Sequence, residues 1–203
     1  MSQNQNHTML LIVGGSTGAG KTRLAHLLGE RLGWPVIARD ELKEVLLDAF
    51  PPATRAESNR LGAPSWALMY RVLDRLIGRV PGVIVEANFR AGRSEPELLD
   101  RLESCGGVYV HCVAAWETVE ERLHARKDDP ARHAGHFDAE AFPEVRADWE
   151  RGAYAPMDLD MPVFTVHTDA DTDDGYRPSL ATLVQAIERR ANALSAMSGQ
   201  ASS

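Results

Sequence analysis

A run of eight residues near the start of the chain constrains the fold more than any other feature. Gly15-Ser16-Thr17-Gly18-Ala19-Gly20-Lys21-Thr22 fits the phosphate-binding loop pattern G-x-x-x-x-G-K-S/T at every fixed position, directly after the apolar stretch Met9 to Val13. Its glycines lack a Cβ, so the backbone can turn tightly and direct N–H groups at phosphate oxygens. Lys21 adds charge at the β- and γ-phosphates, and Thr22 offers a hydroxyl to Mg²⁺ at the start of a helix whose positive end faces the same anion. The run therefore predicts a nucleoside triphosphate site, with ATP and Mg²⁺ as the expected cofactors.

Composition narrows the class of protein. The 203 residues suit a single domain over 1–203, and 44% hydrophobic residues can form a substantial core. The net charge of −7, from 29 acidic and 22 basic residues, has the wrong sign for a protein that mainly grips long nucleic acid. The N-terminal segment Met1–Thr8 is polar and has no lysine or arginine, so it indicates neither a signal peptide nor a membrane anchor. Cys105 and Cys112 are typical of buried thiols in a reduced compartment. We expect a cytoplasmic monomer or homodimer.

Apolar runs and helical periodicity alternate along the chain. Strands are predicted at Met9–Gly14, Val36–Ala38, Val83–Ala87, Val108–Ala114 and Val163–His167. Helices are predicted at Lys21–Leu32, Asp40–Phe50, Ser65–Ile77, Glu95–Ser104, Thr118–Arg126, Ala139–Arg151 and Ser179–Leu194. A polar loop is expected after Pro51-Pro52, a charged, turn-rich segment at 127–138, and a frayed, flexible tail at 195–203. Strands that are almost wholly apolar, each followed by a helix, predict an α/β fold with a parallel sheet covered on both faces.

Ligands of such a sheet collect beyond the carboxyl ends of its strands, so the residues there are the candidates for a site. Arg39-Asp40 follows the second strand. Asp40 could orient a hydroxyl and accept its proton, or it could cap the helix that it begins. Glu86 ends the third strand and could hold Mg²⁺ through water or orient a substrate, or be a solvated strand end. Asn88 and Arg90 follow it, and Arg90 could grip an acceptor or be an ordinary loop charge.

A basic segment follows the fourth strand. Arg122, Arg126 and Arg132 could belong to a mobile lid, about 127–138, that brings positive charge to a transferring phosphoryl group and excludes water. The alternative is a solvated helix face whose charges pair with nearby acidic residues. His133 and His136 lack a third ligand at suitable spacing and give little indication of a metal site.

These motifs together resemble the small P-loop kinases with the nucleoside-monophosphate-kinase-like fold. Within them the chain is most similar to predicted AAA-type kinases, zeta toxins, chloramphenicol phosphotransferase and the 5′-kinase domain of polynucleotide kinase. The resemblance rests on Gly15 to Thr22, Ala38 to Leu42, Val85 to Arg90 and Arg122 to His136. One departure is that Glu86 to Arg90 lacks the Asp-Gly-aromatic-Pro-Arg run of monophosphate kinases, which weakens the case for a nucleotide acceptor.

The resemblance implies a three-layer fold with sheet order 2-3-1-4-5 and a helical lid. By it, Asp40 would be the general base, Arg126 and Arg132 the lid arginines, and residues 168–171 neighbours of the adenine. Lys21, Asp40, Arg126 and Arg132 are then the expected catalytic residues. Gly15 to Thr22 and Arg122 would bind the nucleotide, Thr22 the metal. Arg39, Asp40, Glu86, Asn88 and Arg90 would bind the acceptor.

The leading hypothesis is an ATP-dependent kinase acting on a hydroxyl of a small molecule such as a sugar, an antibiotic or a metabolite. A 5′-hydroxyl polynucleotide kinase would need a basic groove, which the net charge disfavours. A zeta-type kinase of an amino-sugar nucleotide and a nucleotide-dependent switch remain alternatives. A switch has no need of an acceptor-side base, so Asp40 separates these possibilities.

Overall fold

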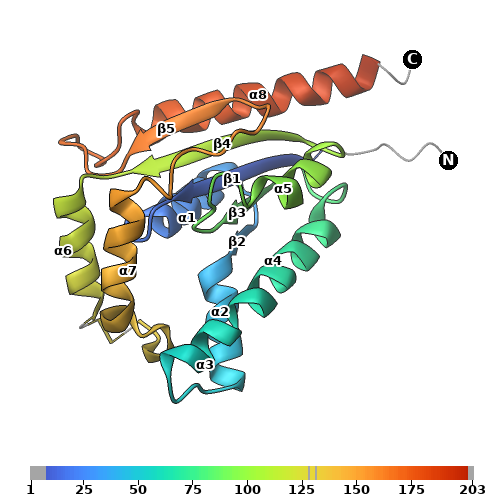
Figure 1. Cartoon of the computed structure of the whole chain (residues 1–203). Helices are drawn as coiled ribbons and strands as arrows, with labels where there is room; N and C mark the ends of the chain where they lie inside the picture. Colours follow the sequence, from blue (N-terminus) through green and yellow to red (C-terminus); the bar gives the residue numbers. More distant parts are fainter. Residues whose placement is uncertain (1–7, 128, 131, 201–203) are drawn as a thin grey trace.

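A parallel sheet of five strands runs through the computed structural model of the chain, which describes residues 8–127, 129–130 and 132–200 (Figure 1). The strands are β1 (Met9–Gly15), β2 (Val36–Ala38), β3 (Gly82–Glu86), β4 (Gly106–Val113) and β5 (Val163–His167). Their order is β2-β3-β1-β4-β5, which confirms the predicted order. Every residue of β1 and β3 is buried, because these strands lie inside the sheet and both of its faces are covered.

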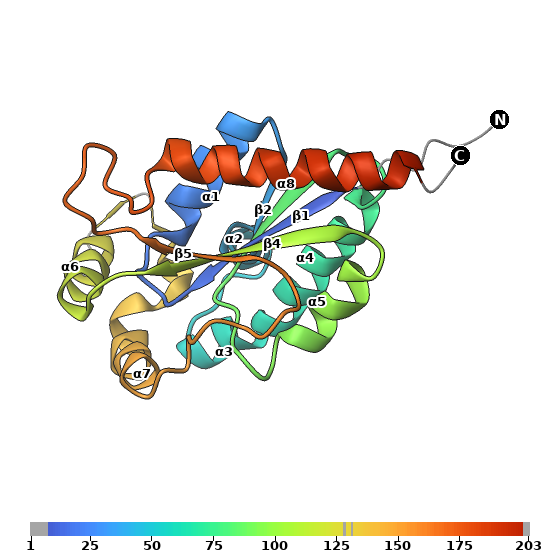
Figure 2. The ribbon, with the colours of Figure 1, turned by 90° about the horizontal axis from the view of Figure 1, so that it is seen from above.

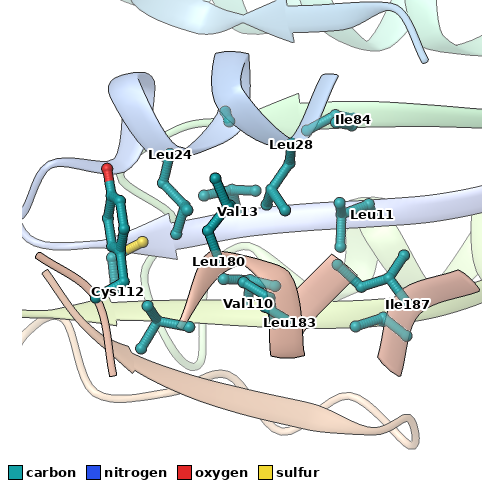
Figure 3. Close-up of a cluster of buried hydrophobic side chains, with 14 of the residues drawn as sticks. Leu11, Val13, Leu24, Leu28, Ile84, Val110, Cys112, Leu180, Leu183 and Ile187 are labelled. Carbon is teal, nitrogen blue, oxygen red and sulfur yellow. The ribbon is translucent and has the colours of Figure 1, made fainter. Parts of the chain in front are cut away.

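Helices cover the two faces of the sheet, and the side chains of β1 alternate between them. Leu11 and Val13 point to the face covered by α1 (Lys21–Leu32) and α8 (Leu180–Gln200). Figure 3 shows this layer, with leucines of α1 and of α8 packed around the strands. Leu10 and Ile12 point to the opposite face, where α4 (Gly62–Leu76) and α5 (Glu95–Leu102) pack. The result is a three-layer α/β sandwich.

The remaining helices lie toward the carboxyl ends of the strands. They are α2 (Arg39–Ala49), α3 (Arg55–Arg60), α6 (Trp116–Lys127), the short 3₁₀ helix η1 (Ala134–His136) and α7 (Asp138–Glu150). α6 and α7 lie side by side in both views of the ribbon (Figures 1 and 2). η1 contacts α3, because the Ser58 hydroxyl donates to the Gly135 carbonyl at 2.6 Å. No helix within the described part of the chain combines the length and the apolar composition needed to cross a bilayer.

Two predicted segments were wrong. The polar loop after Pro51-Pro52 contains α3, which has no apolar periodicity and is held by a Thr54 cap and by a hydrogen bond from the Lys43 ammonium to Ser58. The last helix does not end near Leu194 but continues to Gln200, because no Gly or Pro interrupts it before Gly199. Residues 201–203 of the predicted tail lie outside the described residues.

Candidate active site

The register of the sheet brings three predicted segments to one edge. Glu86, the last residue of β3, lies opposite Val13 of β1 and opposite Ala38 of β2. The residues that follow these positions are the phosphate-binding loop, the pair Arg39-Asp40, and the segment with Asn88 and Arg90. Residues far apart in the sequence are therefore neighbours at the carboxyl ends of three adjacent strands.

The phosphate-binding loop folds back on itself around the Lys21 side chain. The Lys21 ammonium donates to the Ser16 carbonyl at 2.8 Å, and only 8% of the residue is exposed. Gly15 and Gly18 have positive φ angles of 136° and 82°. A Cβ on Gly15 would lie 2.2 Å from the Cys112 carbonyl oxygen, so no other residue fits there. The loop is thus a backbone cradle suited to phosphate oxygens, directly before α1.

Glu86 connects the loop to the third strand. The Thr22 hydroxyl donates to Glu86 Oε2 at 3.0 Å, and Lys21 Nζ lies 3.9 Å from Glu86 Oε1. Glu86 is 3% exposed, so it is not a solvated strand end. Burial raises the pKa of its carboxyl group, although the positive charge of Lys21 opposes this. A hydroxyl beside a carboxylate is an oxygen donor set that Mg²⁺ accepts, directly or through water.

Asp40 lies in the first turn of α2 and does not cap it. The N-cap is Ala38, and no side chain makes a capping hydrogen bond, so the helix-cap interpretation is wrong. Asp40 Oδ1 instead accepts from Arg39 Nη1 at 3.0 Å, and its other oxygen lies 3.9 Å from Arg132 Nη2. Burial acts to raise the pKa of Asp40, but Arg39, His136, Arg132 and Lys21 outweigh it and hold the pKa below the usual value. Asp40 is ionised at neutral pH.

Arg126 in the last turn of α6 and Arg132 in the segment between α6 and α7 both interact electrostatically with Asp40. Arg132 donates to Asp138 at 2.8 Å, and its Nη1 lies 3.4 Å from Glu44 of α2. Burial lowers the pKa of Arg126 and Arg132 adds to this, whereas the charges of Asp138, Asp40 and Glu86 oppose it. Both arginines are partly buried, unlike the charges of a solvated helix face, although Arg132 does pair with nearby acidic residues as the alternative expected. Asp128 and Ala131 of the predicted lid lie outside the described residues.

Arg122, one turn before Arg126, holds the phosphate-binding loop from the side. Its guanidinium donates to the Gly18 carbonyl at 3.2 Å and to the Thr168 carbonyl at 2.6 Å. The Thr168 hydroxyl in turn donates to the Ala19 carbonyl at 2.8 Å. Arg122 and Thr168 therefore fix the loop against the residues that follow β5.

A pocket of about 660 Å³ opens beside the ends of β2 and β3, and it is called the acceptor pocket below because it contains residues that the sequence predicted to bind an acceptor. Arg39, Asn88 and Arg90 line it, together with Trp66 and Tyr70 of α4. Arg39 also donates to the Ser65 hydroxyl at 3.0 Å and lies over the Trp66 ring at 5.5 Å. Since Arg39 contacts both the pocket and Asp40, the pocket begins next to Asp40.

Arg90 is held by residues that the sequence did not indicate. It forms an ion pair with Asp148 of α7 and lies 5.1 Å over the Tyr154 ring. Tyr154 also donates to Asp148 at 3.3 Å, and burial raises its pKa although a hydrogen bond with Thr17 opposes this. Asp148 and Tyr154 thus connect the acceptor pocket to the phosphate-binding loop. The partners in these contacts are 58 and 64 residues apart in the sequence, so no local pattern could have revealed them.

Comparisons with known proteins agree with this geometry. The model of the family described as AAA domain matches residues 10–151. No curated protein matches the sequence significantly. A solved structure from Chloroflexus aurantiacus J-10-fl, described as a candidate kinase, is 26% identical, with a TM-score of 0.73, and the match covers 91% of this chain and 98% of that one.

More distant solved structures include a gluconokinase from Sinorhizobium meliloti 1021, at 16% identity, a TM-score of 0.49 and coverage of 95% of this chain and 97% of that one. A tunicamycin resistance protein from Deinococcus radiodurans is 19% identical, with a TM-score of 0.48 and coverage of 91% and 95%. The family match spans more than half of the chain, and the sheet order agrees with it. The chain belongs to the AAA domain family and has the α/β fold of the P-loop kinases.

Proposed function

We propose that the protein is a kinase that transfers the terminal phosphoryl group of ATP to a hydroxyl group of a small molecule. The observation that carries this proposal is the position of Asp40. It is an ionised carboxylate beside Lys21 and Arg132 and next to a pocket that can hold an acceptor. A nucleotide switch has no use for such a group. The similarity to the Chloroflexus aurantiacus structure supports the proposal.

The roles of the residues follow from charge and position. In the transfer, an acceptor oxygen forms a bond to the γ-phosphorus while the bond from that phosphorus to the β,γ-bridging oxygen breaks, and the hydroxyl proton passes to Asp40. The cations around Asp40 make it a weak base, so it mainly orients the hydroxyl and takes the proton late. Arg126 and Arg132 would stabilise the negative charge on the transferring group, as parts of a lid over residues 127–138.

ATP and Mg²⁺ fit the residues that are present. Gly15 to Gly20 and Lys21 would hold the phosphates, with Arg122 keeping the loop in place. Thr22 would bind the metal and Glu86 would hold it through water or directly. The metal would supply charge neutralisation between the phosphates.

The test is a screen for acceptor-dependent ATP consumption. The panel contains pooled sugars, aminoglycosides, nucleosides, polyol acids and 5′-hydroxyl oligonucleotides, each with and without Mg²⁺. We expect one small-molecule pool to raise ATP consumption well above the rate in buffer, and the Lys21→Met variant to abolish the increase. A protein that binds ATP and responds to no pool, or only to oligonucleotides, would contradict the proposal.

A further inference from the structure

The acceptor pocket carries an excess of positive charge although the chain as a whole is acidic. Five arginines line it, namely Arg39, Arg71, Arg90, Arg93 and Arg101, against two acidic residues, Asp74 and Glu97. The net charge of the chain is −7. The question is which of these arginines are already neutralised by the protein.

Three of the five have acidic partners. Arg101 binds Asp74 at 2.7 Å and Glu97 at 3.3 Å, and its guanidinium also lies over the Tyr70 ring. Arg90 is paired with Asp148, and Arg39 with Asp40. The two acidic residues of the lining are therefore both engaged by Arg101.

Arg71 and Arg93 are different. Both side chains are exposed, and within the described residues neither has a hydrogen-bond or ion-pair partner. Arg71 comes from α4 and Arg93 from the turn before α5, so two separate elements bring an uncompensated guanidinium to the same pocket. A guanidinium presents paired N–H donors that match a phosphate or a carboxylate.

Resting on the kinase function proposed above, we propose that the acceptor is a small molecule with one anionic group, a phosphate or a carboxylate. Arg71 and Arg93 bind that group while the hydroxyl to be phosphorylated faces Asp40. A longer polyanion fits less well, because the adjoining hollow is lined by three carboxylates and one arginine, Asp74, Glu97, Asp100 and Arg101, and so keeps a net negative charge. Those carboxylates repel a chain of phosphates that extends past the pocket.

Calorimetric titration with matched probes tests this proposal. Glycerol, glycerate and glycerol 3-phosphate share one skeleton and differ in the anionic group. Each is titrated into protein saturated with Mg²⁺ and a non-hydrolysable ATP analogue, so that the phosphate-binding loop is filled. We expect at least one of the two anions to bind about tenfold or more tightly than glycerol, as charge-assisted hydrogen bonds require. The stronger of the two identifies the group.

The double variant R71Q/R93Q should lose that preference and keep its melting temperature, because both side chains are exposed. Arg75→Gln is the matched control, since it makes the same change one turn later on α4 and outside the pocket lining. The proposal is overturned if the wild-type protein shows no preference for an anion, if the preference survives in R71Q/R93Q, or if a 5′-hydroxyl oligonucleotide binds more tightly than either small anion.

Binding in this experiment needs no phosphoryl transfer. A failure here therefore contradicts the anionic acceptor alone. The kinase function is contradicted instead by the absence of any acceptor-dependent ATP consumption in the screen.

Discussion

At the scale of single residues, two carboxylates that both interact with Lys21 have opposite electrostatic environments. Asp40 is surrounded by cations, which lower its pKa, whereas Glu86 is enclosed in the core, which raises its pKa. The ionised carboxylate of Asp40 therefore stabilises the folded state, whereas the ionised carboxylate of Glu86 destabilises it. Replacing Asp40 and replacing Glu86 should therefore change the stability of the fold in opposite directions, and both substitutions should reduce activity.

Asp40→Asn should reduce phosphoryl transfer by about 10²- to 10⁴-fold, the usual contribution of a group that orients the acceptor hydroxyl and takes its proton in the transition state. ATP affinity should change little, because the phosphate-binding loop is untouched. Glu41→Gln is the control, since Glu41 is the next residue and pairs with His26 away from the pocket. Kinetics and nucleotide titrations of both variants check this. Transfer within a few-fold of wild type in Asp40→Asn would remove Asp40 from the mechanism.

The effect of Asp40→Asn on the stability of the fold should depend on pH in a definite direction. A carboxyl group with a lowered pKa stabilises the fold above its unfolded value of 3.8, and that contribution is lost as the pH falls through the folded pKa. The variant should therefore be slightly less stable than wild type at pH 7, and the two melting temperatures should converge in acid. The effect is small because 43% of the side chain is exposed.

Glu86→Gln should be more stable than wild type at pH 7.5 and about 10- to 100-fold less active, as is usual when a group that supports a metal is removed. A raised folded pKa means that the ionised carboxylate opposes folding above that pKa, and the cost disappears as the pH falls toward 4.5. The gain in melting temperature should accordingly shrink in acid. Melting curves across this range, with ATP turnover on the same preparation, measure both effects. A less stable variant at pH 7.5 would show that the Lys21 contact dominates instead.

At the scale of elements, α6 has two arginines one turn apart with different partners. Arg122 is bound to Gly18 and Thr168, whereas Arg126 lies in the field of Asp40 and Glu86. The helix thus fixes the phosphate-binding loop and, in the function proposed above, directs charge at the transfer site. Its apolar residues pack it against the loop, since a Cβ on Gly18 would contact Val119 at 2.9 Å.

Arg126→Ala should lower kcat by about 10²- to 10³-fold, as for other donors that meet charge in the transition state, and leave ATP affinity within a few-fold. Arg122→Ala should mainly weaken ATP binding and change kcat less, because the phosphate-binding loop loses its hydrogen bond from Arg122. Single-turnover kinetics and nucleotide titrations separate the two. Equal effects of both substitutions on kcat would contradict this division of roles.

At the scale of the whole molecule, stability depends on how the last helix closes one face of the sheet. Leu194 of α8 packs on Gly106 at the start of β4, where a Cβ would lie 2.1 Å from Leu194 Cδ1. Leu194 is half-buried against the core beneath α8. The last turns of α8 therefore cover the sheet near the start of β4.

Leu194→Ala should cost about 1–3 kcal/mol of unfolding free energy, which corresponds to a fall of several degrees in melting temperature. Ala196→Ser, on the exposed side of the same helix, should change it by less than about 0.5 kcal/mol. Thermal and urea unfolding of both variants check this. Equal stability of Leu194→Ala and wild type would mean that the last turns of α8 add nothing to the core.

The sequence predicted the sheet well because each strand is a continuous apolar run between turn residues. Even the three-residue strand Val36–Ala38 was predicted with its observed bounds. It predicted α3 poorly, because that helix depends on Lys43 and Gly135, which are distant in the chain. The residues of the site also differ in how far the sequence could predict them. The phosphate-binding loop is a local motif, whereas the roles of Asp148 and Tyr154 exist only once α7 and the residues after it pack against Arg90 and the loop.

The order of the strands also has an evolutionary consequence. The acceptor pocket is built from residues 39–101, on the β2 side of the sheet, and the nucleotide loop and its supports come from residues 15–22 and 122–168, on the β4 side. In the function proposed above, substitutions in α4 and before α5 can therefore alter the acceptor without touching the groups that would hold ATP. One inherited site for ATP would in this way serve a succession of substrates, with selection acting on one half of the molecule.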